Sequence, residues 1–209
     1  SKVSRGGVLS LTGDFNHESY NVNGADYSIS DRETIPTNNR DYQTSDINRA
    51  LIHHAIRSTG ATGETDIVLT LPVGHFFNSD GTKNDDLISA KIANAKGDIS
   101  YMDGSENATI SNVYVLPEGV PAFAYAKHEL ELTGNRFLMA DVGGTTTDLV
   151  MLDGQDQIQS YKTMEVGALN MLSDFAHLVR AKLNLNGLPD NIALNGLLYG
   201  VIAGTDVSE

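Results

Sequence analysis

One eight-residue segment between two apolar runs constrains this chain more than any other feature. It extends from Asp141 to Asp148 and reads Asp-Val-Gly-Gly-Thr-Thr-Thr-Asp, with apolar runs at 137–140 and 149–152. Two short strand-like runs joined by a glycine pair predict a β-hairpin whose tip exposes backbone N–H groups. Adjacent glycines let the backbone approach an anion closely, and threonine hydroxyls add further donors. The segment therefore predicts a phosphate-binding loop.

The aspartates at the two ends of this loop would repel a free polyphosphate. A divalent cation removes the conflict, since Mg²⁺ binds through one or two carboxylates, phosphate oxygens and retained waters. The motif therefore predicts Mg-nucleotide rather than bare phosphate. A Gly- and Thr-rich hairpin without a ligand is the simpler alternative. However, an ordinary short hairpin favours Asn-Gly or Asp-Gly and needs neither two aspartates nor three threonines.

The surroundings of the loop exclude two other phosphate-binding motifs. A P-loop reads G-x-x-x-x-G-K-[ST] and a dinucleotide fingerprint reads G-x-G-x-x-G, and each leads into a helix. Neither spacing occurs here. The run 149–152 is followed by an Asp-Gly turn and a further strand-like run at 158–163. A meander of strands places the loop at a hairpin tip rather than at a helix N-terminus.

Composition and charge limit the class of protein. The 209 residues suffice for one large or two small domains, and the net charge is -13. Such an acidic chain repels nucleic acid and anionic membranes, so we expect any contact with DNA to be made through a partner. The absence of cysteine excludes disulfides and thiolate metal sites. No apolar run approaches the ~18 residues of a membrane span, which favours a cytoplasmic protein.

Strand and helix patterns alternate along the whole chain, which predicts an α/β fold. Asn23-Gly24 predicts a type I′ hairpin between 18–22 and 25–29. The run 66–72 lacks alternation and suits a central strand that is covered on both faces. Helices are expected at 45–58, 85–96, 120–132 and 167–185, strands at 99–102 and 108–115, and the apolar segment 192–202 is of open type.

Four charged or polar side chains on these helices have simple interpretations. Lys91 and Lys96 are interpreted as part of a solvated face of the helix at 85–96. His53 and His54 resemble a metal-ligand pair, but adjacent helical residues point about 100° apart and do not easily face one ion. They are interpreted as packing or interface residues.

Several motifs together resemble a known family. The hairpin from Asp141 to Asp148 resembles the second phosphate loop of the actin, Hsp70 and sugar-kinase ATPases. Four further segments, in order and at approximate spacing, resemble the plasmid-segregation actins of the ParM (StbA) type. They are Tyr-Asn-Val-Asn-Gly at 20–24 with Tyr-Ser at 27–28, Ser-Asp-Ile-Asn at 45–48 with His-His-Ala at 53–55, Asp-Ile-Val-Leu-Thr-Leu-Pro at 66–72, and Val-Leu-Pro-Glu-Gly-Val-Pro-Ala at 115–122.

The resemblance assigns roles to individual residues. Asp141 matches the aspartate that positions the attacking water and the hydrated Mg²⁺, and Glu118 matches the acid that helps to polarise the water. Four residues match the loop around the β- and γ-phosphates, and one precedes the long helix near the nucleotide sugar; these are Gly143, Gly144, Thr145, Thr146 and Gly167. For Glu118, general chemistry is compatible with a water-orienting role, although an ordinary acid at a helix N-terminus is the simpler interpretation of its sequence. Asp148 is either a second-shell residue or the close of the hairpin.

Two motifs of the family are absent, which makes the chain resemble an internal fragment. There is no Asp-x-Gly phosphate loop near Ser1, and no Gly-Gly-Gly adenosine loop follows the second phosphate loop. The expected fold is therefore a partial actin-like (ribonuclease H-like) ATPase fold. Residues 1–135 are predicted to form the remainder of actin-like domain I with its small subdomain, and residues 136–209 the first half of domain II.

The family implies a function for the parent protein. It is a nucleoside triphosphatase that binds Mg²⁺ with ATP or GTP, forms filaments with itself, and separates plasmid copies through a DNA-binding adaptor of the ParR type. Direct contact with nucleic acid or membrane is not expected. A sugar or small-molecule kinase of the same superfamily is an alternative. A further alternative is that these residues form a non-catalytic interaction fragment with weak nucleotide affinity.

Overall fold

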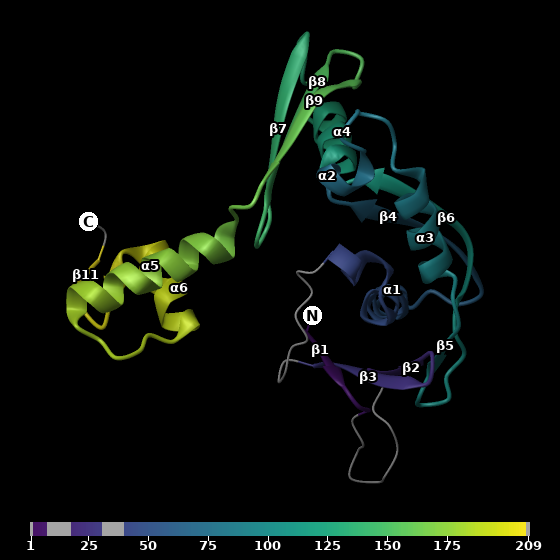
Figure 1. Ribbon diagram of the computed structural model, residues 1–209, viewed down its shortest axis with the longest axis horizontal. Coiled ribbons are helices and arrows are strands. Elements are labelled where there is room, and N and C mark those ends of the chain that lie inside the picture. Colours follow the sequence, from purple (N-terminus) through teal and green to yellow (C-terminus); the bar gives the residue numbers. More distant parts are fainter. Residues whose placement is uncertain (1, 8–17, 31–39, 208–209) are drawn as a thin grey trace. The chain divides into compact units, whose positions relative to one another are not determined.

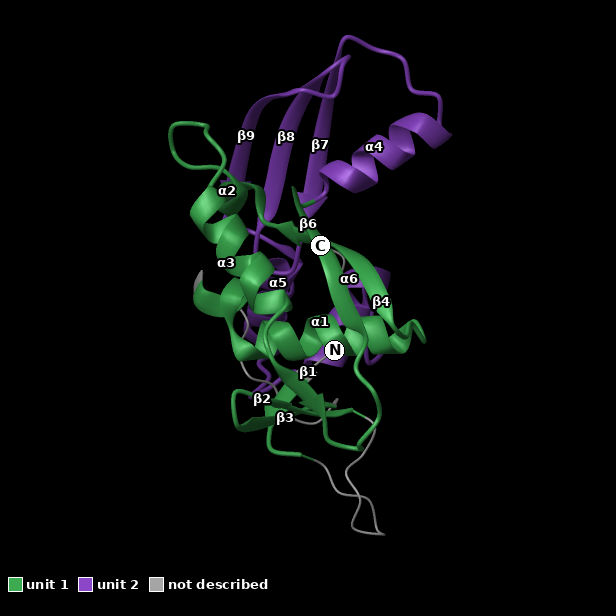
Figure 2. Cartoon of the chain, turned by 90° about the vertical axis from the view of Figure 1, so that its right-hand side faces the viewer, with its two compact units in different colours: residues 1–118 green, residues 119–209 purple. Residues whose placement is uncertain are grey.

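The computed structural model of the protein describes residues 2–7, 18–30 and 40–207. The chain divides into two compact units, residues 1–118 and 119–209 (Figure 2). The sequence placed a domain boundary after residue 135. Helix α4 (Val120–Glu129) belongs to the second unit, and its Phe123 ring lies tilted against Phe137 of the following hairpin, with ring centroids 5.4 Å apart. The assignment of two actin-like domains to residues 1–135 and 136–209 stays a prediction.

The first unit contains two sheets and several helices (Figure 1). In chain order, the elements of this unit are β1 (Lys2–Arg5), β2 (Ser19–Val22), β3 (Ala25–Ser30), the 3₁₀-helix η1 (Arg40–Thr44), α1 (Asp46–Ser58), β4 (Glu64–Leu71), α2 (Val73–Phe76), α3 (Asp85–Ala95), β5 (Ile99–Tyr101) and β6 (Thr109–Pro117).

The smaller sheet of this unit is antiparallel and has the strand order β1-β3-β2-β5. The predicted hairpin is confirmed, since β2 and β3 pair around Asn23 and Gly24, whose φ values of 53° and 80° are those of a type I′ turn. Tyr20 and Val22 are fully buried on one face of this sheet. They form a core with Ala50 from α1, so the sheet packs against that helix.

Helix α1 lies between the two sheets of the first unit, as Figures 1 and 2 both show. Ser45 caps its N-terminus, because its Oγ accepts a hydrogen bond from the Asn48 N–H at 3.2 Å. Ile52 and Ile56 face away from the small sheet, toward a second core that contains Ile67 and residues of α3 and β6. The helix is therefore covered along two faces.

Strands β4 and β6 pair in parallel, and only one face of this pair is covered within the described residues. Ile67 and Leu69 pack toward α1. On the opposite face Val68 is 59% exposed, and Tyr114 and Leu116 of β6 are exposed beside it. The prediction of a strand covered on both faces is therefore wrong for this chain, since the described residues supply a layer on one side alone.

The second unit contains a three-stranded antiparallel sheet and a helical pair. The sheet consists of β7 (Arg136–Val142), β8 (Thr147–Asp153) and β9 (Ile158–Met164), as the meander pattern predicted. The remaining elements are α5 (Ala168–Leu183), α6 (Asp190–Tyr199), β10 (Val201–Ile202) and β11 (Thr205–Asp206). The segment of open type is thus mostly helix. None of the described helices has the length and apolar character needed to cross a membrane.

Candidate functional site

The loop between β7 and β8 is a closed hairpin tip. Asp141 pairs with Asp148 and Val142 with Thr147 in the antiparallel register, and the Gly143 N–H then donates to the Thr146 carbonyl at 2.8 Å. Neither Gly143 nor Gly144 has a left-handed φ. Space explains Gly143 instead, since a Cβ there would lie 3.1 Å from the Thr146 carbonyl oxygen. The predicted hairpin is confirmed, and its tip is built on close backbone packing.

The carbonyl groups of this tip face the N-terminus of α5. The Ala168 N–H donates to Gly143 O at 2.9 Å, and the Leu169 N–H donates to Gly144 O at 2.7 Å. Helix N-termini leave N–H groups without intrahelical partners, so the loop satisfies two of those of α5. This direct bonding joins loop and helix into one structural part.

Gly167 makes this close approach possible. A Cβ at position 167 would lie 2.5 Å from both the carbonyl carbon and the oxygen of Gly144, and 2.6 Å from the Gly143 oxygen. These are backbone atoms, so a side chain would force the loop and helix apart. The Gly167 N–H donates to the Asn170 side chain at 3.0 Å. The structure thus gives Gly167 a packing role, while its predicted contact with the nucleotide sugar stays a prediction.

The tip also carries donors that have no hydrogen-bond partner in the described part of the chain. Among the described residues, the amides of Gly144, Thr145 and Thr146 have no hydrogen-bond acceptor, and neither have the hydroxyls of Thr145 and Thr146. The third threonine differs, because Thr147 Oγ1 donates to the Val166 carbonyl at 2.6 Å. Unbonded backbone amides and hydroxyls in a turn are the kind of donors that bind phosphate oxygens. Gly143, Gly144, Thr145 and Thr146 lie at this tip, and their contact with the β- and γ-phosphates stays a prediction.

The two aspartates of the motif have different surroundings. Asp148 is 4% exposed and accepts a hydrogen bond from the Thr163 hydroxyl, so its side chain connects β8 to β9. Asp141 is half-buried and lies beside Gly119, where a Cβ would be 3.0 Å from its Oδ2 and 2.8 Å from the Met139 sulfur. The φ of +76° at position 119 also favours glycine. Of the two aspartates, Asp141 is thus the one whose carboxylate is available to a ligand.

The loop has one available carboxylate, that of Asp141, which limits the kind of metal site it can form. Within the described part of the chain, no group of three or more His, Asp or Glu side chains could hold a metal ion. A cage made by protein side chains alone is therefore not present there. Mg²⁺ commonly keeps several waters and takes the rest of its ligands from one or two carboxylates and the phosphates. Asp141, on the strand that leads into the loop with the unbonded amides, has the chemistry for that mode of binding.

Glu118 lies in the first unit, at the end of β6. Its N–H donates to the Leu71 carbonyl at 2.8 Å, which extends the β4–β6 ladder by one residue, and its side chain is exposed. It lines a groove of about 640 Å³ whose walls come from α1 and β4. The structure therefore places Glu118 at a strand end as predicted, and its role with the water stays a prediction.

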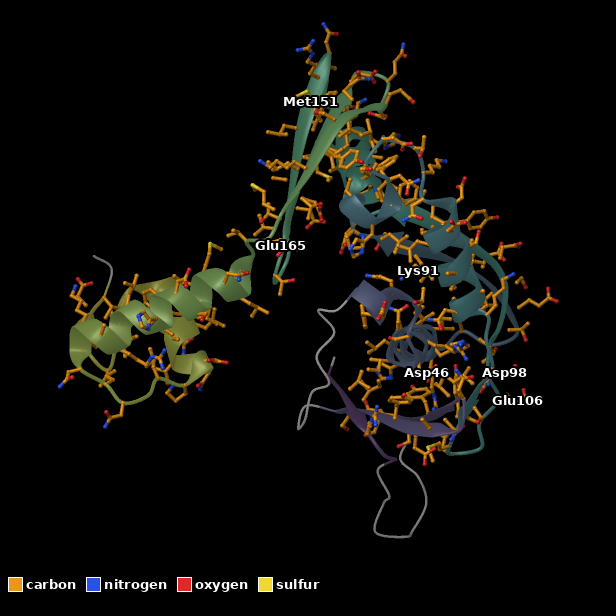
Figure 3. The ribbon with its side chains drawn as sticks, viewed as in Figure 1. Asp46, Lys91, Asp98, Glu106, Met151 and Glu165 are labelled. Carbon is orange, nitrogen blue, oxygen red and sulfur yellow. The ribbon has the colours of Figure 1, made fainter. Side chains whose placement is uncertain are left out.

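Lys91 also lines this groove, and the prediction that it belongs to a solvated face is wrong. It is 3% exposed, and it extends from α3 toward η1 and α1 (Figure 3). Its Nζ donates to Gln43 Oε1 at 2.6 Å and to Asn48 Oδ1 at 3.4 Å. Burial lowers its pKa from 10.5 to about 8, while the charge of Glu118 raises it. Lys96, at the end of the same helix, is exposed as predicted.

Helical spacing was the signal that could have identified Lys91 as buried. Position 91 follows Ile88 by three residues and precedes Ala95 by four, so the three side chains share one face of α3. That face packs against α1 and β6. A lysine on an apolar stripe needs polar partners, and those partners come from η1 and α1, which lie far away in sequence.

The two adjacent histidines of α1 pack as predicted. His53 is 4% exposed, with Nε2 at 3.2 Å from the Ala95 carbonyl, and burial is the main cause that lowers its pKa. His54 points to the small sheet, where its Nδ1 lies 2.9 Å from the Tyr20 hydroxyl. The side chains thus bond to different elements rather than to one ion.

Comparisons with known proteins agree with this geometry. The model of the family "Plasmid segregation protein ParM, N-terminal" matches residues 5–129. Comparison with curated proteins returns no sequence match. Among solved structures, the ADP complex of Ta0583, an archaeal actin homologue, superposes with a TM-score of 0.69 at 16% identity, over 97% of this chain and 71% of that one.

Two further structures show the same fold. Ta0583 in its native form gives a TM-score of 0.67 at 17% identity, over 90% of this chain, which spans 62% of the length of that protein. MreB 5 of Spiroplasma citri bound to AMPPNP gives 0.51 at 17% identity, over 73% of this chain and 40% of that one. With the family match covering more than half of its residues, this α/β chain has an actin-like fold and belongs to the family of the plasmid segregation protein ParM.

Proposed function

We propose that this chain is part of an actin-like nucleoside triphosphatase that binds Mg-ATP or Mg-GTP at the loop from Asp141 to Asp148. The observation that carries the proposal is the set of free donors at the loop tip. The backbone amides of three consecutive residues, Gly144 to Thr146, have no hydrogen-bond acceptor among the described residues. The half-buried Asp141 lies on the strand that leads into this loop. Backbone donors of this kind bind phosphate oxygens, and such a site suits a polyphosphate that carries a hydrated cation.

Each site residue has a proposed part in the reaction. The amides of residues 144–146 bind the phosphates, and Asp141 holds the hydrated Mg²⁺ and orients the attacking water. Mg²⁺ would supply neutralisation of charge on the transferred phosphoryl group. The role proposed for Glu118, which comes from the family resemblance, is to polarise water for hydrolysis. Phosphoryl transfer needs positioning and electrostatic stabilisation more than covalent chemistry, which is what these residues provide.

Family membership extends the proposal from nucleotide binding to assembly. Since the chain belongs to the ParM family, we infer that the parent protein forms filaments with itself in the cytoplasm and acts in plasmid partition. The net charge of -13 opposes direct binding to DNA, so a basic adaptor of the ParR type would connect filament and plasmid.

Calorimetric titration of the 209-residue chain with Mg-ATP and Mg-GTP tests the nucleotide site. We expect weak binding, with a Kd on the order of 0.1–1 mM. Excess EDTA should reduce the affinity at least tenfold, because it removes the cation. The substitution Gly144→Val should also reduce it at least tenfold, because a Cβ at position 144 would lie 3.3 Å from the Leu169 side chain and a branched side chain would press on it. Equal binding by the wild type and Gly144→Val would refute the proposed site.

Light scattering tests the assembly proposal separately. We expect scattering by the parent protein to rise when ATP or GTP is added with Mg²⁺ and to fall as the nucleotide is hydrolysed. Absence of assembly with any nucleotide would contradict the filament proposal, and would leave a soluble kinase of the same superfamily as the better description.

Asp141→Asn, which removes the carboxylate charge at nearly constant size, should bind nucleotide without normal hydrolysis.

A further inference from the structure

Strand β4 has an unpaired edge. It pairs in parallel with β6, and it has no second neighbour among the described residues. A strand with one neighbour leaves a row of N–H and C=O groups unpaired on its other side. Parallel sheets are normally covered on both faces, whereas Val68 of this pair is 59% exposed. The β4–β6 pair therefore has the features of one border of a larger sheet.

The groove of about 640 Å³ follows this edge. Six consecutive residues of β4, 65–70, line it, which is the usual length of a strand. Because neighbouring side chains of a strand point to opposite faces, a groove that contacts all six runs along the edge rather than over one face. Its other wall is α1, which contributes Leu51, Ile52, Ala55 and Ile56. The groove thus lies between an apolar helix wall and a strand edge.

The part of the groove near the N-terminus of α1 is polar. Gln43, Asn48 and Lys91 line it together. The ammonium of Lys91 donates to the amide oxygens of Gln43 and Asn48, at 2.6 and 3.4 Å. An ammonium carries three donors, so one donor has no acceptor among the described residues. An occupant of the groove can therefore offer a hydrogen-bond acceptor at this place.

We propose that the groove between α1 and the open edge of β4 receives a further β-strand, supplied by a part of the parent protein outside these 209 residues. The added strand bonds to the free edge of β4, places apolar side chains against Leu51 and Ala55, and offers an acceptor to Lys91. The inference rests on one element of the proposed function, namely that this chain is part of a longer protein. It does not depend on the nucleotide site.

Three observations favour this occupant. A strand edge presents alternating donors and acceptors, which another strand satisfies and an apolar small molecule does not. The ADP complex of Ta0583 superposes on 97% of this chain, but this chain spans 71% of that one, so the fold includes residues that have no counterpart here. A second copy of this chain is disfavoured because each copy carries a net charge of -13.

Filling the groove tests the proposal in two proteins of different length. Ala55 is exposed on α1 and lines the groove, whereas Ser58 is exposed on the same helix and lies outside it. In the 209-residue chain, Ala55→Trp and Ser58→Trp should each change the Tm by less than about 2 °C. In the parent protein, Ala55→Trp should lower the Tm by about 5 °C or more, because the indole competes with the added strand, and Ser58→Trp should not. Equal effects of Ala55→Trp in the two proteins overturn the proposal.

Hydrogen exchange locates the added strand directly. Exchange of the amides of residues 64–71 is measured without nucleotide in both proteins, with the amides of α1 as an internal reference for overall stability. We expect about half of these β4 amides to exchange at least 100-fold more slowly in the parent protein, because they gain hydrogen-bond partners. Exchange that is equally fast in both proteins contradicts the proposal. Protection that disappears on dilution also overturns it, since a second copy would then be the occupant. Absence of Mg-nucleotide binding would contradict the proposed function alone.

Discussion

Helices α1 and α5 both have an amphipathic pattern in sequence, yet they are held in opposite ways. α1 is enclosed along its length, with six buried residues that include Asn48, Arg49 and His53. α5 is longer but has two buried residues, Ala176 and Val179, and large apolar side chains such as Leu178 remain 66% exposed. Its firm attachment is at one end, where Ala168 and Leu169 donate to the loop carbonyls.

The difference shows that similar sequence patterns serve different purposes in the two units. Side-chain packing and polar contacts hold α1 in place, so substitutions along it should change stability. Backbone bonding attaches the N-terminus of α5 to the loop, so substitutions at its N-cap should change the loop and its ligand. Four pairs of substitutions test this contrast, from the largest expected effect to the smallest.

Removing a buried side chain from α1 should cost far more than removing an exposed one from α5. Ile52→Ala deletes a side chain that is 9% exposed, and we expect the free energy of unfolding to fall by about 2–4 kcal/mol. Leu178→Ala should change it by less than about 0.5 kcal/mol. Urea denaturation monitored by circular dichroism measures both. Equal losses would mean that α5 is covered in solution in a way that the described residues do not show.

The end attachment of α5 is tested at Gly167. Gly167→Ala places a Cβ 2.5 Å from the Gly144 backbone, so the loop and helix must separate. We expect a loss of about 1–3 kcal/mol in stability and at least tenfold weaker binding of Mg-nucleotide. Gly187→Ala is the control, because a Cβ there meets no atom within 4 Å. Unchanged nucleotide affinity in Gly167→Ala would show that loop geometry does not depend on α5.

The buried charge beside α1 predicts a pH dependence of stability. The pKa of Lys91 is about 8 in the folded chain and 10.5 is its ordinary value, so between these the unfolded chain binds more protons. The cost of burying the charge is therefore fully present below pH 8 and is relieved as pH rises toward 10.5. Relative to Lys91→Met, the wild type should gain about 1–3 kcal/mol across this window. Urea unfolding of both proteins at each pH checks the sign, and Lys96→Met should show no such trend.

The contact between Tyr20 and His54 should make a smaller contribution to the free energy of unfolding, and this contribution should decrease above pH 10. Tyr20→Phe removes the hydroxyl that lies 2.9 Å from His54 Nδ1, which should cost about 1 kcal/mol at neutral pH. Burial raises the pKa of Tyr20 from 10 to about 12, so this contribution is fully present below pH 10 and is lost as pH rises to 12. The difference from Tyr20→Phe should therefore shrink in that window. Tyr114→Phe, at an exposed tyrosine, should show neither effect.

Local signals predicted much of the fold because each is decided within a few residues. Asn23-Gly24 specifies a turn with two positive φ angles, Ser45 supplies its own cap, and the glycine pair at 143–144 forms the predicted hairpin tip. The family resemblance, carried by motifs over about three quarters of the chain, is confirmed by the match to residues 5–129.

The features that sequence analysis missed depend on contacts between distant residues. Burial of Lys91 is decided by Gln43 and Asn48, which lie more than forty positions away. The exposure of Val68 depends on which layers cover the β4–β6 pair, and a strand pattern does not contain that information. Likewise, the packing of Gly167 on Gly144 is a tertiary contact that the nucleotide-based interpretation of this glycine did not anticipate.

Because Ala168 and Leu169 bond to the loop, a movement of the loop would tilt α5 about its N-terminal end at Gly167. Its 16 residues extend about 24 Å from that point. A tilt of about 5° imposed at the loop would displace the other end of the helix by roughly 2 Å. Because α6 packs on α5, the displacement would carry α6 with it. A rearrangement of a few tenths of an ångström around a phosphate would thus reach a surface one helix length away, with no chain segment between them needing to unfold.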